Sequence, residues 1–303
     1  MNSVTSTDFS LDLINSALSV AERKRIRNFD RPQLRPVVVV GAPRSGHTLF
    51  SQLLAASGAF GFISNFTARF WNAPVLAAEL QRSLGLSEAP VFTSDHGRIS
   101  GWTAPHEGGR FLQRLIKLGE THVADERPAA STVSEWRSEL AALEDFHQRN
   151  VMLRNVIYGL NLPILFEALP NALIVVCRRD PLYQAQSIYE ARIKGAGADT
   201  WWSAKPANST TLMNLEWPQQ IAGQIAGCYE AIDKHRAAFK NNFIDISYEA
   251  YCANPQDQVA AVLGAAGIAA PTNSLPSIVS TNTKREPDDV IDRLHQALST
   301  TGL

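Results

Sequence analysis

The stretch Val37–Phe50, VVVVGAPRSGHTLF, decides the fold of this chain. Its four β-branched valines lack the alternation of a half-exposed strand, which predicts a strand buried on both faces, as in a parallel sheet. Gly, Pro and Ser then indicate a turn, and residues 48–56, TLFSQLLAA, place apolar side chains at helical spacing. The stretch therefore predicts a strand, a glycine-bounded loop and a helix in succession.

The predicted loop is suited to binding an anion. A helix N-terminus presents free N–H groups and the positive end of the helix dipole. The spacing of Gly41, Gly46 and Thr48 is that of a nucleotide P-loop, but His47 stands where such loops carry Lys. That lysine reaches the β- and γ-phosphates in phosphoryl-transfer enzymes, so its absence argues against ATP or GTP. Arg44 supplies a fixed cation instead, which a plain tight turn would not need.

The loop sequence APRSGHTL, residues 42–49, resembles the 5′-phosphosulfate loop of the sulfotransferases that depend on PAPS (3′-phosphoadenosine 5′-phosphosulfate). The resemblance implies a three-layer, P-loop-like α/β fold with a central parallel sheet flanked by helices. It also implies PAPS as donor, PAP as product and no metal. The residues it assigns to the donor here are Arg44, Ser45, Gly46, His47 and Thr48. Arg44 and His47 are also expected to act at the reacting group, although the family usually has Thr at the position of His47.

A second buried strand is predicted over residues 172–177, and it runs into the cation pair Arg178 and Arg179. Ser187 follows Arg179 by eight residues, two turns into the next predicted helix. Both side chains are therefore expected to converge on one anion outside the sheet edge. In the sulfotransferase family, an Arg and a Ser at this spacing hold the 3′-phosphate of PAPS. The alternative is a surface cation and an ordinary hydroxyl on a helix face.

Two further motifs extend the resemblance to about residues 37–285. Tyr248, at the end of a strand predicted over 242–249, stands where the family places a Tyr that borders the adenine. Lys284 and Arg285 stand where the family places a basic loop over the nucleotide. The usual Arg-Lys-Gly sequence is absent there, and a solvated charge pair is the alternative.

An acceptor must lose a proton as it attacks, so the sequence should supply a His or a carboxylate as base. His106 and Glu107 are the leading candidates because they are adjacent in a polar, glycine-rich loop and related enzymes use either residue type. Asp95 and His96, in the same loop, are the reserve pair. Arg154, at the end of a strand predicted over 151–155, is a candidate to hold the sulfuryl oxygens.

Composition limits the remaining possibilities. The 303 residues could form one large α/β domain or two smaller ones, and 45% hydrophobic content is enough for a full core; a single domain over 1–303 is the prediction adopted. The net charge of −1 gives no electrostatic case for nucleic acid or an anionic membrane. Three scattered cysteines, and the absence of a leader or of an integral membrane segment, predict a cytoplasmic protein. Segments of about 90–110 and 195–215 are expected as lid or acceptor walls. A helix at about 8–27 is expected to dock on the domain or in a homo-oligomer.

The preferred hypothesis is a soluble sulfotransferase of bacterial type. It would transfer the sulfuryl group of PAPS by in-line displacement to a hydroxyl or amine of a small-molecule or glycan acceptor. A P-loop kinase that uses ATP and Mg²⁺ is one alternative, and a nucleotide-binding protein without catalysis is another.

Overall fold

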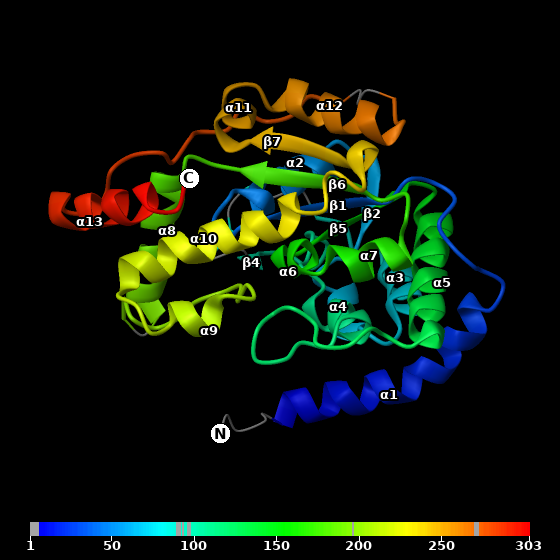
Figure 1. The fold of residues 1–303 in the computed structure, drawn as a ribbon. Coiled ribbons are helices and arrows are strands. Elements are labelled where there is room, and N and C mark those ends of the chain that lie inside the picture. Colours follow the sequence, from blue (N-terminus) through cyan, green and yellow to red (C-terminus); the bar gives the residue numbers. More distant parts are fainter. Residues whose placement is uncertain (1–5, 89–91, 93, 96–97, 196, 270–272) are drawn as a thin grey trace.

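The computed structural model describes the chain except for residues 1–5, 89–91, 93, 96–97, 196 and 270–272. Its centre is a parallel sheet in the order β2, β5, β1, β6, β7 (Figure 1). These strands are β1 (Val37–Gly41), β2 (Phe60–Phe62), β5 (Asn150–Arg154), β6 (Leu173–Arg178) and β7 (Phe243–Ser247). The predicted parallel sheet is confirmed, and the valine strand lies in the middle of it.

The valines of β1 face two different hydrophobic cores. All four are completely buried. Val38 and Val40 belong to the core on one face of the sheet, whereas Val37 and Val39 belong to the core on the other. Because successive side chains of a strand point to opposite faces, a strand that serves two cores is apolar at every position. This arrangement explains the uninterrupted run of valines.

Helices cover both faces of the sheet, which confirms the three-layer α/β fold (Figure 1). One face carries α2 (His47–Ala56), α11 (Tyr248–Ala253) and α12 (Pro255–Ala266). The other carries α4 (Gly109–Leu115), α5 (Ala130–His147), α6 (Val156–Leu160), α7 (Leu162–Ala168), α8 (Pro181–Gly195), α10 (Trp217–Asp233) and α13 (Asp288–Ser299). The structure also has α1 (Ser6–Ile26), η1 (Thr67–Phe70), α3 (Pro74–Ser83), α9 (Ser209–Leu212), η2 (Lys240–Asn242) and the antiparallel pair β3 (Ser94–Asp95) and β4 (Arg98–Ile99). Within the described ranges, no helix is both long and apolar enough to span a membrane.

Some element boundaries differ from the sequence-based predictions. The pattern over 66–84 predicts one helical segment broken at Pro74. The structure has η1 followed by α3, and α3 starts at Pro74. Proline suits the first position of a helix because the N–H that it lacks would have no acceptor there. The strand predicted through residue 249 ends at Ser247. The hydroxyl of Ser247 accepts the N–H of Ala250 at 3.3 Å and so caps helix α11.

Two buried polar side chains attach helix α1 to the rest of the protein. Oδ1 of Asn15 accepts the N–H of Asn72 at 2.9 Å. The carboxylate of Glu22 accepts the N–H groups of Val75 at 2.8 Å and Leu76 at 3.1 Å, which have no acceptor within their own helix at the start of α3. Burial raises the pKa of Glu22 to about 6, against the effect of these two hydrogen bonds. Glu22 therefore joins α1 to α3 by capping the second helix with a side chain of the first.

The substitution Glu22→Ala should leave the N–H groups of Val75 and Leu76 buried without an acceptor. The free energy of unfolding should fall by about 2 kcal/mol, or roughly 4 °C in melting temperature for a chain of this size. Thermal unfolding followed by circular dichroism measures the change. Glu230→Ala, at an exposed position of α10, is the matched control and should have little effect. Equal melting temperatures for Glu22→Ala and the control would contradict the capping role.

Candidate functional site

The loop between β1 and α2 has the backbone of an anion-binding turn. Arg44 has φ 65° and Gly46 has φ 87°, both in the left-handed region, and the N–H of Ser45 donates to the carbonyl oxygen of Ala42 at 3.2 Å. The first N–H groups of α2 have no acceptor within the helix and point out of its N-terminus. A helix start of this kind favours a bound anion.

The position of Gly46 admits only glycine. A Cβ there would lie 2.6 Å from Cδ2 of Tyr248 and would collide with the hydroxyl of Tyr251. That hydroxyl donates to the carbonyl oxygen of Gly46 at 3.0 Å. Helix α11, which carries both tyrosines, therefore fixes the loop from one side.

The carboxyl end of β6 brings further polar groups to the loop. Nε of Arg44 donates to Oγ of Ser187 at 2.8 Å, and Nη1 of Arg179 donates to the carbonyl oxygen of Arg44 at 3.4 Å. The guanidinium of Arg179 also lies over the ring of Tyr248, 4.4 Å from its centroid. Residues that the family resemblance assigns to two different phosphates therefore form one contiguous cluster.

The segment before α13 completes this cluster. Arg179 donates from Nε to Oδ1 of Asn282 at 2.7 Å and from Nη2 to Oγ1 of Thr281 at 3.2 Å. The N–H of Thr281 donates to the hydroxyl of Tyr248 at 2.9 Å. These hydrogen bonds hold the Arg179 guanidinium beside the loop.

The two basic residues that follow are placed differently. Arg285 forms a two-point ion pair with Glu190 of α8, from Nε at 2.7 Å and from Nη2 at 3.1 Å. Lys284 is exposed to solvent. Arg285 also donates from Nη1 to the carbonyl oxygen of Thr281 at 2.6 Å, so it ties this segment to α8 beside the residue that contacts Arg179.

A cavity of about 580 Å³, here called the P-loop cavity, opens at this cluster. Its lining comes from the loop, from Arg179 and Tyr248, and from residues 277–281. Trp202 and Ser203 form another part of its wall. Part of the segment 195–215, expected as a lid or acceptor wall, therefore lies beside the anion-binding loop.

Two basic side chains, His47 and Arg154, approach the carboxylate of Glu107 near the start of α2. His47 is buried, with Nδ1 3.3 Å from Oγ of Ser45 and Nε2 3.8 Å from Oε1 of Glu107. Arg154, buried at the end of β5, donates from Nη1 to Oγ1 of Thr48 at 2.7 Å. The same Nη1 lies 3.5 Å from Oε1 of Glu107. Glu107 thus lies between an imidazole and a guanidinium from two other elements.

The surroundings set the protonation states of this group. Burial lowers the pKa of His47, and the positive charges of Arg154 and Arg44 lower it further, against the opposing effect of the Glu107 carboxylate. Burial alone would raise the pKa of Glu107. His47, Arg154 and His106 outweigh that effect, so the pKa of Glu107 is lowered. At neutral pH the site therefore holds a neutral imidazole beside an ionised carboxylate.

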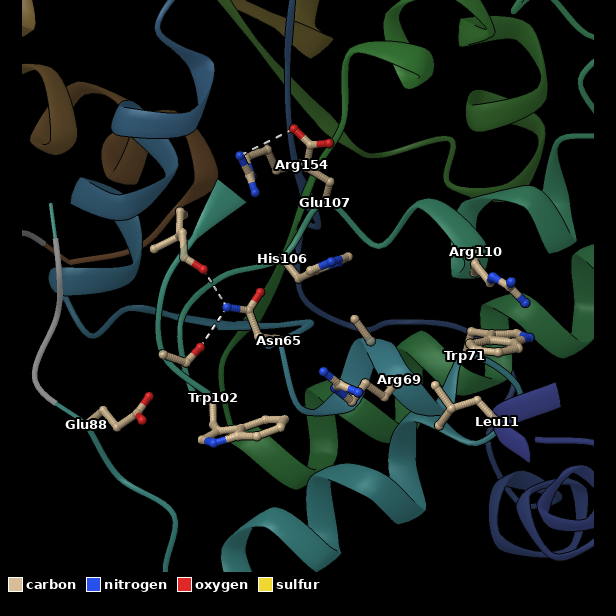
Figure 2. Close-up of a pocket in the computed structure, with 13 residues that line it drawn as sticks. Leu11, Asn65, Arg69, Trp71, Glu88, Trp102, His106, Glu107, Arg110 and Arg154 are labelled. Carbon is tan, nitrogen blue, oxygen red and sulfur yellow. Dashed lines mark hydrogen bonds and ion pairs between the residues drawn. The ribbon is translucent and has the colours of Figure 1, made fainter. Parts of the chain in front are cut away.

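A second cavity, of about 670 Å³, is here called the Trp102 cavity (Figure 2). Side chains from α1, η1 and the loop over 99–110 line it together with Arg154. Among the described lining residues, Glu107 alone belongs to both cavities. The two cavities therefore meet at this carboxylate.

The loop over 99–110 is held along the segment that follows β2. Ser64 forms an isolated antiparallel bridge with Pro105. Nδ2 of Asn65 donates to the carbonyl oxygens of Ile99 at 2.7 Å and Gly101 at 2.6 Å (Figure 2). These contacts bring Glu107 from a distant part of the sequence to the end of β5.

The other predicted base candidates lie in this region or outside the described residues. His106 is exposed in the Trp102 cavity, and its Nδ1 accepts the N–H of Gly108 at 2.9 Å (Figure 2). Asp95 is the second residue of the two-residue strand β3. His96 lies outside the described residues.

The sequence patterns did not single out Tyr251, Thr281 or Asn282. A signal for Tyr251 exists, because a helix capped by Ser247 places Tyr248 and Tyr251 three residues apart on one face. Thr281 and Asn282 have no comparable signal. They meet Arg179 across about a hundred residues of chain, through contacts that no local pattern encodes.

Comparisons with known proteins bear on the family and on the fold of this chain. The profile of the family described as "Sulfotransferase family" matches residues 36–272. The chain is similar in fold to the sulfotransferase STF9 from Mycobacterium avium, with a TM-score of 0.56, 14% identity, and coverage of 93% of this chain and 71% of that one. It is also similar to STF1 from Mycobacterium tuberculosis H37Rv, with a TM-score of 0.54, 18% identity, and coverage of 97% and 79%. A search of curated proteins gave no match.

The substitution Gly46→Ala should disturb the loop strongly, because the new Cβ meets Tyr248 and Tyr251 at a left-handed backbone position. We expect the free energy of unfolding to fall by about 2–4 kcal/mol. The matched control is Gly264→Ala, in helix α12, where a Cβ has no heavy atom within 4 Å. Denaturant unfolding should show the control at or slightly above wild-type stability. A Gly46→Ala protein as stable as the control would contradict the packing described here.

Proposed function

Because the chain belongs to the sulfotransferase family, we propose that it transfers the sulfuryl group of PAPS to a hydroxyl or amine of a small-molecule or glycan acceptor. The observation that carries the proposal is the position of Glu107, which lines both cavities. A donor in the P-loop cavity and an acceptor in the Trp102 cavity would meet there. In the in-line displacement, the acceptor atom bonds to sulfur while the bond from sulfur to the 5′-phosphate oxygen breaks.

The residues of the P-loop cavity fit a ligand with anionic groups. The start of α2 offers N–H donors, and Arg44 and Arg179 bring two guanidinium groups to the same cavity. Nε2 of His47 is buried and has no hydrogen-bond partner among the described residues. Because buried polar atoms are normally paired, this nitrogen suits a ligand oxygen at the loop. When bound, PAPS supplies an activated sulfuryl group.

Glu107 is the base in this proposal. Its lowered pKa keeps the carboxylate ionised at neutral pH, so it accepts the proton that the attacking acceptor loses. Arg154 holds the carboxylate through an ion pair at 3.5 Å, and Nε2 of His47 lies 3.8 Å from it. His106 is the alternative base, since it lines the same cavity.

The loop stabilises the negative charge that develops during transfer. Negative charge builds on the departing 5′-phosphate oxygen, and the α2 N-terminus together with Arg44 stabilises it without rearrangement. Thr48 is held by Arg154 at 2.7 Å, which fixes the first turn of the helix for this task.

Binding of PAP, the product, tests the donor site directly. PAP at about 100 times its Kd should add about 2.7 kcal/mol of stability, or on the order of 5–10 °C in melting temperature if unfolding is reversible. Arg179→Ala should remove most of this shift, whereas Arg127→Ala, at a largely exposed side chain, should retain it. A shift with ATP and Mg²⁺ but none with PAP would contradict the proposal and favour a kinase.

The pH dependence of turnover identifies the base. The active form of Glu107 is the carboxylate, which is lost only as pH falls through a pKa below the usual 4.5. With the best acceptor from a panel of phenols and sugars, kcat should therefore be level from about pH 5.5 to 7.5. Glu107→Gln should lower kcat by about 10²–10⁴-fold and leave PAP affinity nearly unchanged.

If a histidine is the base instead, the pH profile of kcat changes. In that case kcat would fall below about pH 6.5, the ordinary titration range of imidazole. His106→Gln would then lose more activity than Glu107→Gln.

A further inference from the structure

Two arginines of the Trp102 cavity each make a cation–π contact with a tryptophan of the same cavity, and Figure 2 shows Arg110 over Trp71. The guanidinium of Arg69 lies over the ring of Trp102, 5.0 Å from its centroid, and that of Arg110 lies over Trp71 at 4.2 Å. A guanidinium stacked by its face keeps the N–H donors of its edge available in the plane. These edges are suited to the two oxygens of a carboxylate, sulfate or phosphate.

Three of the charged residues that line this cavity have an ion-pair partner, whereas Arg69 and Glu88 have none among the described residues. Arg154 lies 3.5 Å from the carboxylate of Glu107, and Arg110 pairs with Asp12 of α1 at 2.6 Å. Oε2 of Glu88 accepts the N–H of Thr103 at 3.0 Å, within its own loop region. For Arg69, the described residues provide no carboxylate partner within ion-pair distance. Arg69 is therefore an exposed cation at the cavity that no described carboxylate pairs with.

The backbone of Arg69 and the ring near its guanidinium are both held by other elements, while the side chain itself is exposed to solvent. Its carbonyl oxygen accepts Nδ2 of the buried Asn15 at 2.8 Å, which anchors η1 to α1. Trp102, under its guanidinium, packs edge-on against Phe66 at 6.3 Å. The carbonyl oxygen of Trp102 accepts the N–H of Phe66 at 2.8 Å. Because the backbone and the ring are already fixed, only the side chain has to be ordered when an anion binds, which favours affinity.

We infer that the acceptor is itself an anion: a hydroxylated small molecule whose carboxylate, sulfate or phosphate binds Arg69, with Arg110 beside it, while its hydroxyl reaches Glu107. This inference rests on the proposed function, because it takes Glu107 as the point of transfer. The volume of about 670 Å³ suits a ligand of small-molecule size. Leu11, Ala68 and Ile99 provide apolar lining for the part of the molecule between the hydroxyl and the anion.

Binding of matched acids and amides tests the inference. The panel contains hydroxybenzoates, hydroxyphenylacetates and hydroxycinnamates, each with its uncharged primary amide. Isothermal titration with the PAP-saturated protein should show the best acid binding at least ten-fold more tightly than its amide. Arg69→Met should remove that preference, and Arg69→Lys should restore part of it, since the positive charge returns without the planar fork.

The control variant changes an arginine that lies over an aromatic ring outside this cavity. Arg82 lies over the ring of Phe146 at 3.7 Å, and Arg82→Met should leave the preference for acids unchanged. Equal affinities for acids and amides, or an Arg69→Met protein that still prefers acids, would overturn the inference. So would the failure of every acid to bind a protein that PAP still stabilises.

The same titrations without PAP separate this inference from the proposed function. An acid preference that depends on Arg69, in a protein that PAP does not stabilise, would support the anion site and count against the PAPS donor site.

Discussion

The candidate site depends on how strand β1 is buried. Its valines fill the cores on both faces of the sheet, so the strand has no freedom to shift or tilt, and the turn at its end is presented at a fixed place. The neighbouring strands β5 and β6 run parallel to it and end at the same edge. They deliver Arg154 and Arg179 to the two sides of the turn. A site rich in arginine is thus assembled from strand ends whose own positions are set by apolar packing.

Much of the fold could be predicted from the sequence because its signals are local. Uninterrupted apolar runs indicated β1 and β6, and the Gly-bounded turn before residues 48–56 indicated the start of α2. The order of strands in the sheet has no such local signal, since it depends on which runs pack side by side. The end of β7 was predicted two residues late because Ser247, as a helix cap, outweighs the strand tendency of the tyrosine that follows.

Only part of the candidate site could be predicted from the sequence, because only part of it is marked by local signals. The sequence grouped Arg179 with Ser187 because Arg179 follows a recognisable strand and Ser187 lies in the helix after it, but it did not predict that both contact Arg44. The contacts of Glu107 could not be foreseen in this way. They arise because the loop over 99–110 lies along residues 64–66 through backbone hydrogen bonds that any sequence could make. The ring of Tyr251 beneath Gly46 likewise required knowledge of how α11 packs.

The two cavities draw on separate parts of the molecule and share only Glu107 among their described linings. The P-loop cavity is built at the carboxyl end of β1, a strand whose valines fill the cores on both faces of the sheet. The Trp102 cavity is built mainly on α1, η1 and the loop over 99–110, with Arg154 contributed by the end of strand β5. Under the proposed function, evolution can therefore exchange one acceptor for another by altering the outer elements, while the donor and the chemistry are inherited unchanged. The loop at the end of β1 would then set where transfer occurs, and the outer elements would set which molecule is modified.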